Sequence, residues 1–309
     1  MNPITAYRLP LTAIILAAGK GERLGDKLPK PYIKLVDIPI IVWATKVFNE
    51  HPLIDNIIII TLKEFVNYCR DEIVHKYNLN KVVCVLAGGE KRQDSARIGV
   101  FYATQNVGPH MNPITANRLV PTHLSRRRMC RENGSGTPIT DTIIIHDAAR
   151  PLVSSNLITQ LIETARGSRV FKGGSRQIPS GFLTEGVSPL PLKAVIPVIP
   201  VSNTIKRVEG AFQPNADEPL AHIPRKVVQT LNRENLVETQ TPQLFQANIL
   251  RLAHLKAYQD GVSATDDASL VENFGEKVYT IPGQLNNIKI TTSTDLLFAE
   301  LLIKQTEHR

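Results

Sequence analysis

A glycine-broken loop with two cations close behind it is the part of this chain whose residue types point most directly to chemistry. Gly19, Gly21 and Gly25 follow an apolar run of residues 13–18. Glycines let the backbone turn tightly and leave its N–H groups bare for anions. Arg23 and Lys30 add positive charge within reach of the loop. Backbone donors beside two cations suit the oxygens and the charge of a nucleoside triphosphate.

Two common phosphate-binding loops are excluded by the same segment. A dinucleotide fingerprint needs Gly-x-Gly-x-x-Gly, and Leu24 occupies the position of its third glycine. A Walker A loop ends in Gly-Lys followed by Ser or Thr, and that sequence is absent from the segment. A glycine loop alone leaves open an ordinary strand–turn–helix. The cations Arg23 and Lys30 favour the triphosphate.

Two further loops carry polar residues that could complete such a site. The bare backbone of Gly88-Gly89 can approach a flat pyrimidine, and Ser95 could bind the pyrimidine's polar edge or cap a helix. Asp147 ends an apolar run, where its carboxylate could hold Mg²⁺ or pair with Arg150. His146 is expected to be a packed histidine, because no second His or Cys stands at ligand spacing.

Two residues in the C-terminal third complete the set of candidates. Thr265 is predicted to cap a helix that has acidic residues in its first turn. Lys289 lies within a short apolar run of residues 287–291, which predicts a strand. A lysine in such a run either extends along an edge to solvent or points into a site.

The elements that must position these loops are strand-like apolar runs alternating with helical patterns. Residues 57–60 and 143–145 are apolar throughout, which is typical of parallel strands buried on both faces. The pattern predicts an α/β fold with a mostly parallel, doubly wound sheet, whose ligands bind where the strands end. The predicted strands are 13–17, 56–61, 81–86, 142–146, 193–196, 277–281 and 287–291, and the predicted helices are 40–50, 64–76, 95–104, 156–165, 247–258 and 293–303. The loops 18–30, 88–95 and 147–150 therefore fall at one edge.

The chain has 309 residues, of which 42% are hydrophobic, and this is enough for one large domain or two small ones. We expect a single domain over residues 1–309. The sequence contains no run of 18 apolar residues, so we expect no membrane span. The three cysteines are too few and too scattered for a disulfide framework or a zinc site. They fit a reducing, cytoplasmic compartment, where free cysteine usually fills core space.

Two stretches without periodicity, 105–140 and 166–192, are predicted to be surface insertions. They hold most of the net charge of +8, so the basic balance says little about the site. The arginines of residues 118–131 leave open a non-catalytic protein that binds RNA or an acidic partner, although arginine-rich loops are usually just solvated. We expect no nucleic-acid partner. Residues 197–240 form a further long connection, and residues 195–207 are extended in pattern. Such an excursion from an α/β sheet often packs on another subunit, and residues of about 197–225 are the candidate dimerisation arm.

These stretches together resemble one family, the 2-C-methyl-D-erythritol 4-phosphate cytidylyltransferases of the non-mevalonate isoprenoid pathway. The match runs in family order from about residue 12 to residue 304, outside the two insertions. Its most specific part is His146-Asp147-Ala148-Ala149-Arg150-Pro151. The other matching stretches are Ala17-Ala18-Gly19-x-Gly21-x-Arg23, Pro29-Lys30, Gly88-Gly89-x-x-Arg92-x-x-Ser95, Thr204-Ile205-Lys206-Arg207, Thr241-Pro242-Gln243-x-Phe245, Thr265-Asp266-x-Ala268-Ser269 and Asn287-Ile288-Lys289-Ile290-Thr291.

The resemblance implies a nucleotidyltransferase, active as a homodimer with Mg²⁺, on a Rossmann-like nucleotide-diphospho-sugar transferase sheet with an extended β-arm. Its substrates would be CTP and 2-C-methyl-D-erythritol 4-phosphate, with 4-diphosphocytidyl-2-C-methyl-D-erythritol and pyrophosphate as products. A sibling enzyme, ribitol-5-phosphate cytidylyltransferase, is the alternative with the same fold and chemistry. The pair Ala148-Ala149 favours the methylerythritol branch.

The resemblance also assigns roles to residues of this chain. The residues expected to bind CTP are Ala17, Ala18, Gly19, Gly21, Gly89, Ser95, Ala148 and Arg150. Arg23 and Lys30 would hold the triphosphate and Asp147 would hold the metal. Arg207 and Thr265 would bind the methylerythritol phosphate together with Lys289, and Arg207 would come from the partner subunit. Arg23, Lys30 and Lys289 are the expected catalytic residues.

Overall fold

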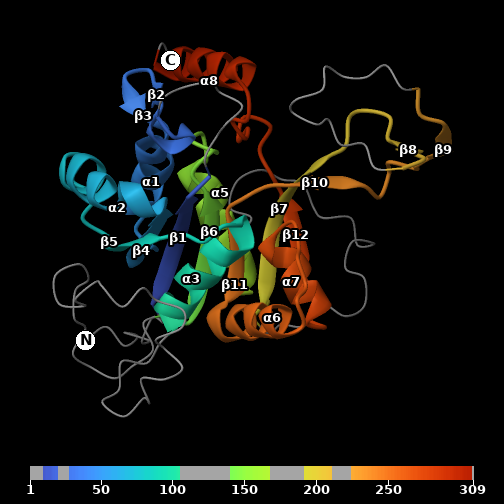
Figure 1. Ribbon diagram of the computed structural model, residues 1–309, viewed down its shortest axis with the longest axis horizontal. Helices are drawn as coiled ribbons and strands as arrows, with labels where there is room; N and C mark the ends of the chain where they lie inside the picture. The colour runs from blue at the N-terminus through green and yellow to red at the C-terminus, as the bar shows by residue number, and fades with distance from the viewer. Residues whose placement is uncertain (1–9, 20–27, 105–139, 168–190, 211–223, 308–309) are drawn as a thin grey trace, which may run out of the picture.

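The computed structural model describes residues 10–19, 28–104, 140–167, 191–210 and 224–307 (Figure 1). Its centre is an eight-stranded sheet in the order β10-β7-β11-β6-β1-β4-β5, with β12 paired to β7. The strands are β1 (Leu11–Ala17), β4 (Asn56–Thr61), β5 (Val82–Ala87), β6 (Thr142–Asp147), β7 (Ala194–Pro200), β10 (Val237–Thr239), β11 (Gln243–Gln246) and β12 (Tyr279–Pro282). The neighbours β6, β1, β4 and β5 run parallel, and β11 is antiparallel to β6 and β7. The predicted mostly parallel α/β sheet is confirmed.

Helices cover both faces of the sheet, as a doubly wound fold requires (Figure 1). One face packs against α1 (Ile40–Glu50), α5 (Ser155–Ala165) and the helical segment of residues 63–75. The other face packs against α3 (Arg92–Thr104), α6 (Ala247–Gln259) and α7 (Asp267–Asn273). Alternate residues of β1 enter the two cores, Ile15 the first and Ile14 the second.

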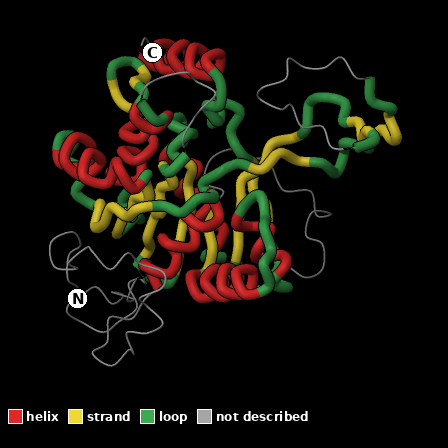
Figure 2. The backbone as a smooth tube through the Cα atoms, viewed as in Figure 1, coloured by secondary structure: helices red, strands yellow, loops and turns green. Residues whose placement is uncertain are grey.

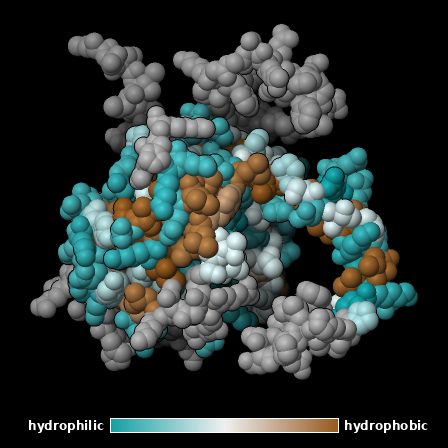
Figure 3. Space-filling view, turned by 90° about the horizontal axis from the view of Figure 1, so that it is seen from above, coloured by the Kyte–Doolittle hydropathy of each residue, from teal (hydrophilic) through white to brown (hydrophobic). Residues whose placement is uncertain are grey.

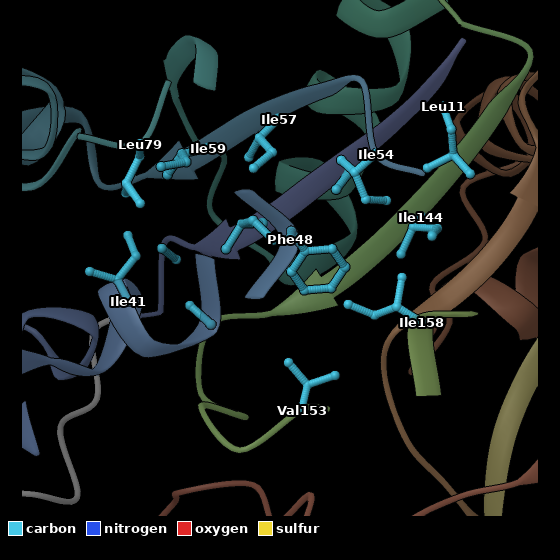
Figure 4. Close-up of a cluster of buried hydrophobic side chains, with 14 of the residues drawn as sticks. Leu11, Ile41, Phe48, Ile54, Ile57, Ile59, Leu79, Ile144, Val153 and Ile158 are labelled. Carbon is cyan, nitrogen blue, oxygen red and sulfur yellow. The ribbon is translucent and has the colours of Figure 1, made fainter. Parts of the chain in front are cut away.

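The first of these cores is built around a buried aromatic ring. Phe48 of α1 lies among Ile57, Ile144 and Ile158, side chains from two strands and a second helix (Figure 4). These four residues are fully buried. Because the strands are apolar on both faces, the sheet is fixed between two helical layers, and its polar groups are displaced to the strand ends.

The register of the parallel strands brings the predicted loops together. Ala17 lies opposite Thr61, and Thr61 lies opposite Ala87. Leu16 lies opposite Asp147 on the other side of β1. The chain after β1, β5 and β6 therefore leaves from one edge of the sheet, as the pattern predicted.

Three local predictions are wrong. Residues 63–75 are not one α-helix but a 3-10 turn (Lys63–Phe65), a short α2 (Val66–Tyr68) and a π-helix (Cys69–His75). Residues 287–291 form no strand, because the Ile290 N–H bonds to the carbonyl of Ala149 in a loop instead of to a neighbouring strand. The cap of α7 is Asp266 and not Thr265, because the Asp266 carboxylate accepts from the Ser269 N–H at 3.0 Å.

An arm leaves the sheet between β7 and β10. It carries β8 (Lys206–Val208) and β9 (Val227–Thr230), an antiparallel pair that forms a sheet of its own. Figures 1 and 2 show the pair projecting to the right, away from the central sheet. The predicted arm of about 197–225 thus reaches further along the chain, to β10.

The C-terminal helix α8 (Ser293–Glu307) packs over Ile290 and over β2 (Lys34–Leu35), which pairs with β3 (Ile38–Pro39). Among the described helices none is long and apolar enough to cross a membrane. Cys69 is free and buried, as expected of a core filler, whereas Cys84 takes part in a disulfide, contrary to expectation. The predicted insertions lie almost wholly outside the described residues, as do all the arginines of residues 118–131.

Candidate active site

Asp147, the last residue of β6, is the centre of the site. Its side chain is 10% exposed, and two cations contact it: Arg92 Nε lies 3.0 Å from Oδ1 and Lys289 Nζ lies 2.8 Å from Oδ2. Burial opposes ionisation of the carboxyl. The charges of Arg92 and Lys289 outweigh that effect and hold the pKa of Asp147 well below its usual range. A charged carboxylate is therefore presented at the edge where ligands of such sheets bind.

His146 supports Asp147 from inside the sheet as a neutral group. Its Nε2 lies 3.0 Å from the Arg150 carbonyl oxygen and must donate, since a carbonyl only accepts. Nδ1 then accepts from the Thr241 hydroxyl, and the same hydroxyl oxygen accepts from the Asp147 N–H. Burial lowers the pKa of His146 to about 4, so the ring is neutral at pH 7. This is the packed histidine that the sequence predicted.

The segment that carries Lys289 is held by the turn that follows Asp147. The Ile290 N–H donates to the Ala149 carbonyl at 2.8 Å, and Arg150 Nη1 donates to the Asn287 carbonyl at 2.7 Å. Arg150 thus binds a carbonyl and is not placed on Asp147, the alternative that the sequence left open. These bonds fix the backbone on both sides of Lys289.

Lys30 is brought to the same segment from the other end of the chain. Its Nζ donates to the Ile290 carbonyl at 3.0 Å. Lys30 opens a 3-10 helix (Lys30–Tyr32), and the buried Tyr32 hydroxyl bonds to Thr61 at the end of β4. Tyr32 also stacks on Phe65 at 5.0 Å between ring centroids. Lys30, Lys289 and Asp147 therefore form one cluster of two cations and one carboxylate.

The glycines of the second loop allow it to approach the first. A Cβ at Gly88 would lie 2.5 Å from the Cβ of Ala18 and 2.7 Å from Ser95 Oγ, distances that no side chain tolerates. The Gly89 N–H donates to Ser95 Oγ at 3.2 Å, and this hydroxyl donates to the Lys91 carbonyl. The buried Ser95 therefore holds the loop from inside α3. It is not the cap of this helix, and its contact with a pyrimidine stays a prediction.

The remaining predicted site residues are placed as follows. Ala17 ends β1 and Ala148 follows β6, and both are buried. Among the described residues, no atom lies within 4 Å of the place where a Cβ on Gly19 would stand. Thr265 is exposed, two residues before a buried aspartate in α7. Arg207 lies on β8, outside the cluster, and Gly21 and Arg23 lie outside the described residues.

Sequence reasoning missed Arg92, the closest cation to Asp147 apart from Lys289. Arg92 Nη1 also lies 2.8 Å from Asp267 Oδ2, and Asp267 is in turn bonded to His254. A signal for Arg92 was available, because a cation in the first turn of a helix opposes the helix dipole and needs an anionic partner. No comparable signal marked Asp267 or His254.

The residues present fit a magnesium ion. Within the described ranges no group of three or more His, Cys, Asp or Glu residues forms a closed metal cage. Mg²⁺ instead is commonly held by one or two carboxylates together with substrate phosphates. Asp147 supplies such a carboxylate, whose oxygens retain free lone pairs beside the bonds from Arg92 and Lys289.

Comparisons with known proteins agree with this geometry. The family model for 2-C-methyl-D-erythritol 4-phosphate cytidylyltransferase matches residues 11–107 and 186–305. The enzyme of that name from Geotalea uraniireducens is 31% identical over 294 residues, with 95% of this chain and 97% of the relative covered. The corresponding enzyme from Syntrophus aciditrophicus is 29% identical over 299 residues, with 97% and 98% covered.

Solved structures extend the likeness to three dimensions. The crystal structure of the Francisella tularensis 2-C-methyl-D-erythritol 4-phosphate cytidylyltransferase is 26% identical, with a TM-score of 0.60 and 94% and 99% of the two chains covered. The 4-diphosphocytidyl-2C-methyl-D-erythritol synthase from Anaerococcus prevotii, 23% identical, has a TM-score of 0.64 and 96% and 97% coverage. The second likeness shows the fold alone.

Proposed function

The chain belongs to the 2-C-methyl-D-erythritol 4-phosphate cytidylyltransferase family, and from that premise we propose that it transfers CMP from CTP to 2-C-methyl-D-erythritol 4-phosphate. The products are 4-diphosphocytidyl-2-C-methyl-D-erythritol and pyrophosphate. The observation that carries the proposal is the convergence of Lys30, Lys289 and Asp147 at the ends of parallel strands. Two lysines beside one carboxylate match the charge of a metal-bound triphosphate meeting a second phosphate.

The reaction needs no nucleophile from the protein. An oxygen of the substrate phosphate attacks the α-phosphorus of CTP in line and forms a new P–O bond. The bond from the α-phosphorus to the oxygen that bridges it to the β-phosphorus breaks, and that oxygen leaves with its electron pair as part of pyrophosphate. The protein's task is to align the two phosphates and to stabilise the negative charge that develops between them.

Each cation of the site has a place in that task. Lys30 and Arg23 neutralise the triphosphate, and Lys289 stabilises the charge between the two phosphates. The backbone of residues 17–19 and the close-packed loop of residues 88–89 bind the nucleotide, while Ala148 and Arg150 line its other side. Thr265 binds the phosphate of the second substrate.

Magnesium completes the electrostatic balance. When bound, it would be held by Asp147 and by phosphate oxygens, and it would neutralise part of the triphosphate charge. The carboxylate is suited to this because the charges of Arg92 and Lys289 hold the pKa of Asp147 well below its usual range, so it is ionised at neutral pH.

We further propose that the enzyme is a homodimer in which Arg207 of each chain completes the site of the other. In the described part of the arm that carries Arg207, β8 pairs with β9, and this pair projects away from the central sheet (Figure 1). Val227 and Val228 are both exposed, and successive strand residues point to opposite faces. Apolar residues on both faces of an exposed hairpin favour burial against a second copy. A cytoplasmic location stays a prediction.

Pyrophosphate release from CTP and Mg²⁺ tests the proposal, with methylerythritol phosphate and ribitol 5-phosphate offered in parallel. Turnover with the first substrate alone is expected. Turnover with ribitol phosphate alone would assign the chain to the sibling enzyme. A folded protein that turns over neither substrate would contradict the proposal.

A further inference from the structure

Arg92 links two buried carboxylates that belong to different parts of the chain. Its Nε lies 3.0 Å from Asp147 Oδ1, at the end of β6. Its Nη1 lies 2.8 Å from Asp267 Oδ2, in the first turn of α7. The guanidinium comes from the first turn of α3, directly after the Gly88-Gly89 loop. One side chain thus joins the nucleotide loop, the metal-binding carboxylate and the segment that carries Thr265.

Asp267 is buried, and each of its oxygens is bonded to a side chain of the protein. Its side chain is 1% exposed, and its second oxygen lies 3.0 Å from His254 Nε2. His254 must donate there, because a carboxylate oxygen only accepts. His254 is itself fully buried, and its Nδ1 has no hydrogen-bond partner among the described residues. Asp267, bonded to His254, therefore holds Arg92 in place.

The two cations on Asp147 differ in freedom. Lys289 has a side chain that is 42% exposed, and Asp147 is the partner of its Nζ. Arg92 is 28% exposed and tied by Asp267 on its far side. When a phosphate arrives, Lys289 can exchange Asp147 for the incoming charge, whereas Arg92 stays on Oδ1. The oxygen Oδ2 is then the one released for another cation.

The same turn of α3 also holds the loop before α7. Gln93 accepts from the Ala264 N–H at 3.0 Å through its carbonyl oxygen and donates to the Val262 carbonyl at 3.0 Å through its amide. Arg92 and Gln93 therefore fix residues 262–267 on both sides of Thr265. A change at Arg92 would disturb the carboxylate and this loop together.

We propose that Arg92, held by Asp267 and His254, is a positioning residue that fixes the Asp147 carboxylate by Oδ1 and leaves Oδ2 for exchange during the reaction. The inference rests on the proposed function. A lysine cannot replace Arg92, since the planar guanidinium reaches two carboxylates in fixed directions and an ammonium is a single point of charge. Arg92 aligns a group that contacts substrate and does not contact substrate itself.

The test compares Arg92→Lys and Asp267→Asn with a matched control on the same helix. Arg97→Lys alters an arginine of α3 that pairs with Asp94 at 2.9 Å and does not contact Asp147. The quantities measured are kcat, KM for each substrate, CTP affinity in Mg²⁺ by calorimetry, and Tm. We expect Arg92→Lys and Asp267→Asn each to lower kcat by about 10- to 100-fold. CTP affinity should change less than about threefold, and Arg97→Lys should retain normal kcat.

The double variant supplies a readout that a merely structural role would not move. If Asp267 acts through Arg92, Arg92→Lys combined with Asp267→Asn lowers kcat no more than the larger single effect. Additive losses, a normal kcat in Arg92→Lys or an equal loss in Arg97→Lys would each overturn the inference. If Arg92→Lys fails to fold, Arg92→Gln with the Asp267→Asn pair gives the same cycle. Wild-type turnover in the same assay separates a failure of this inference from a failure of the proposed function.

Discussion

The Asp147 site and the arm of residues 201–239 place their functional side chains in opposite settings. Around Asp147, groups from β6, α3 and the Lys289 segment meet within 3.0 Å, and the backbone beneath them is bonded to several elements. On the arm, Arg207 and the valines of β9 are exposed. Figure 3 shows both hydrophilic and hydrophobic residues on the surface of the arm, at the right. The first region is built within one chain. The second is an exposed surface that we propose to be covered by a second copy of the chain, and the predictions separate the two cases.

The largest effect is expected inside the cluster. Lys289→Ala and Lys30→Ala should each lower kcat by about 100-fold or more, because each removes a cation that stabilises transferring phosphate. Circular dichroism and Tm should stay close to wild type. Steady-state pyrophosphate release checks the kinetic loss.

Lys193→Ala is the matched control for both lysines. Lys193 forms an exposed ion pair with Glu276 at 2.7 Å, and such pairs contribute little. Its kcat should equal that of wild type. Near-normal turnover in Lys289→Ala or Lys30→Ala would remove that lysine from the mechanism.

The second effect tests whether the arm acts on another chain. Arg207→Ala should raise KM for methylerythritol phosphate and lower kcat/KM by about 10- to 100-fold, with KM for CTP little changed. Arg207→Ala and Lys289→Ala chains are then unfolded, mixed and refolded together. Random pairing gives about one quarter of wild-type activity, because about half of the dimers are mixed and each of these has one intact site.

The outcome distinguishes the two arrangements of Arg207. If Arg207 served its own chain, both sites of a mixed dimer would carry a defect and no activity would return. Lys226→Ala is the control on the arm, since Lys226 pairs with Glu209 in an exposed ion pair at 3.4 Å. It should keep normal kinetics.

The third effect concerns the apolar surface of the arm. Val228 is 56% exposed, and Val228→Asp places a charge on this surface. The dissociation constant of the dimer should rise by about tenfold or more relative to wild type. Sedimentation velocity over a concentration series measures this. Leu301→Asp alters an equally exposed residue of α8 and should leave dimerisation unchanged. Dissociation by Leu301→Asp alone would place the interface on α8 instead.

The contrast also explains which parts of the molecule were predictable. The parallel strands could be predicted because a continuous apolar run such as Ile57–Ile60 indicates a strand that is buried on both faces. The edge that carries Asp147 followed from the ends of those runs. Residues 287–291 have the pattern of a strand, but their partner is a loop carbonyl at Ala149, and no local pattern shows that.

The contacts around Arg92 were beyond prediction for a related reason. Arg92 is separated from Asp147 by 55 positions and from Asp267 by 175 positions. Ion pairs at such separations depend on the fold as a whole and leave no period in the sequence. The arginine's place in a helix's first turn indicated that it needs an anion and did not indicate which one.

The smallest effect is a stability change at the boundary of the site. Asp295, in the first turn of α8, accepts hydrogen bonds from the Thr291 and Thr292 N–H groups, both at 2.8 Å, and from the Thr291 hydroxyl. Slight burial opposes ionisation, but these hydrogen bonds outweigh it and lower the pKa of Asp295 to about 2. Asp295→Asn should cost about 1 kcal/mol at pH 7, the usual range for a lost helix cap.

The pH dependence of that loss follows from the depressed pKa. A carboxyl with a lower pKa in the folded state stabilises it fully above the unfolded pKa of about 4 and progressively less as the pH falls toward 2. Urea unfolding should therefore give a difference in unfolding free energy between wild type and Asp295→Asn at pH 6, and this difference should shrink at pH 3.

Thr291 lies two residues from Lys289, so kcat is the sharper measurement. If kcat stays within about threefold, the Lys289 backbone is held by Ala149 and Arg150 and not by the cap of α8. A loss of kcat as large as that of Lys289→Ala would show that the cap of α8 also holds the Asp147 site.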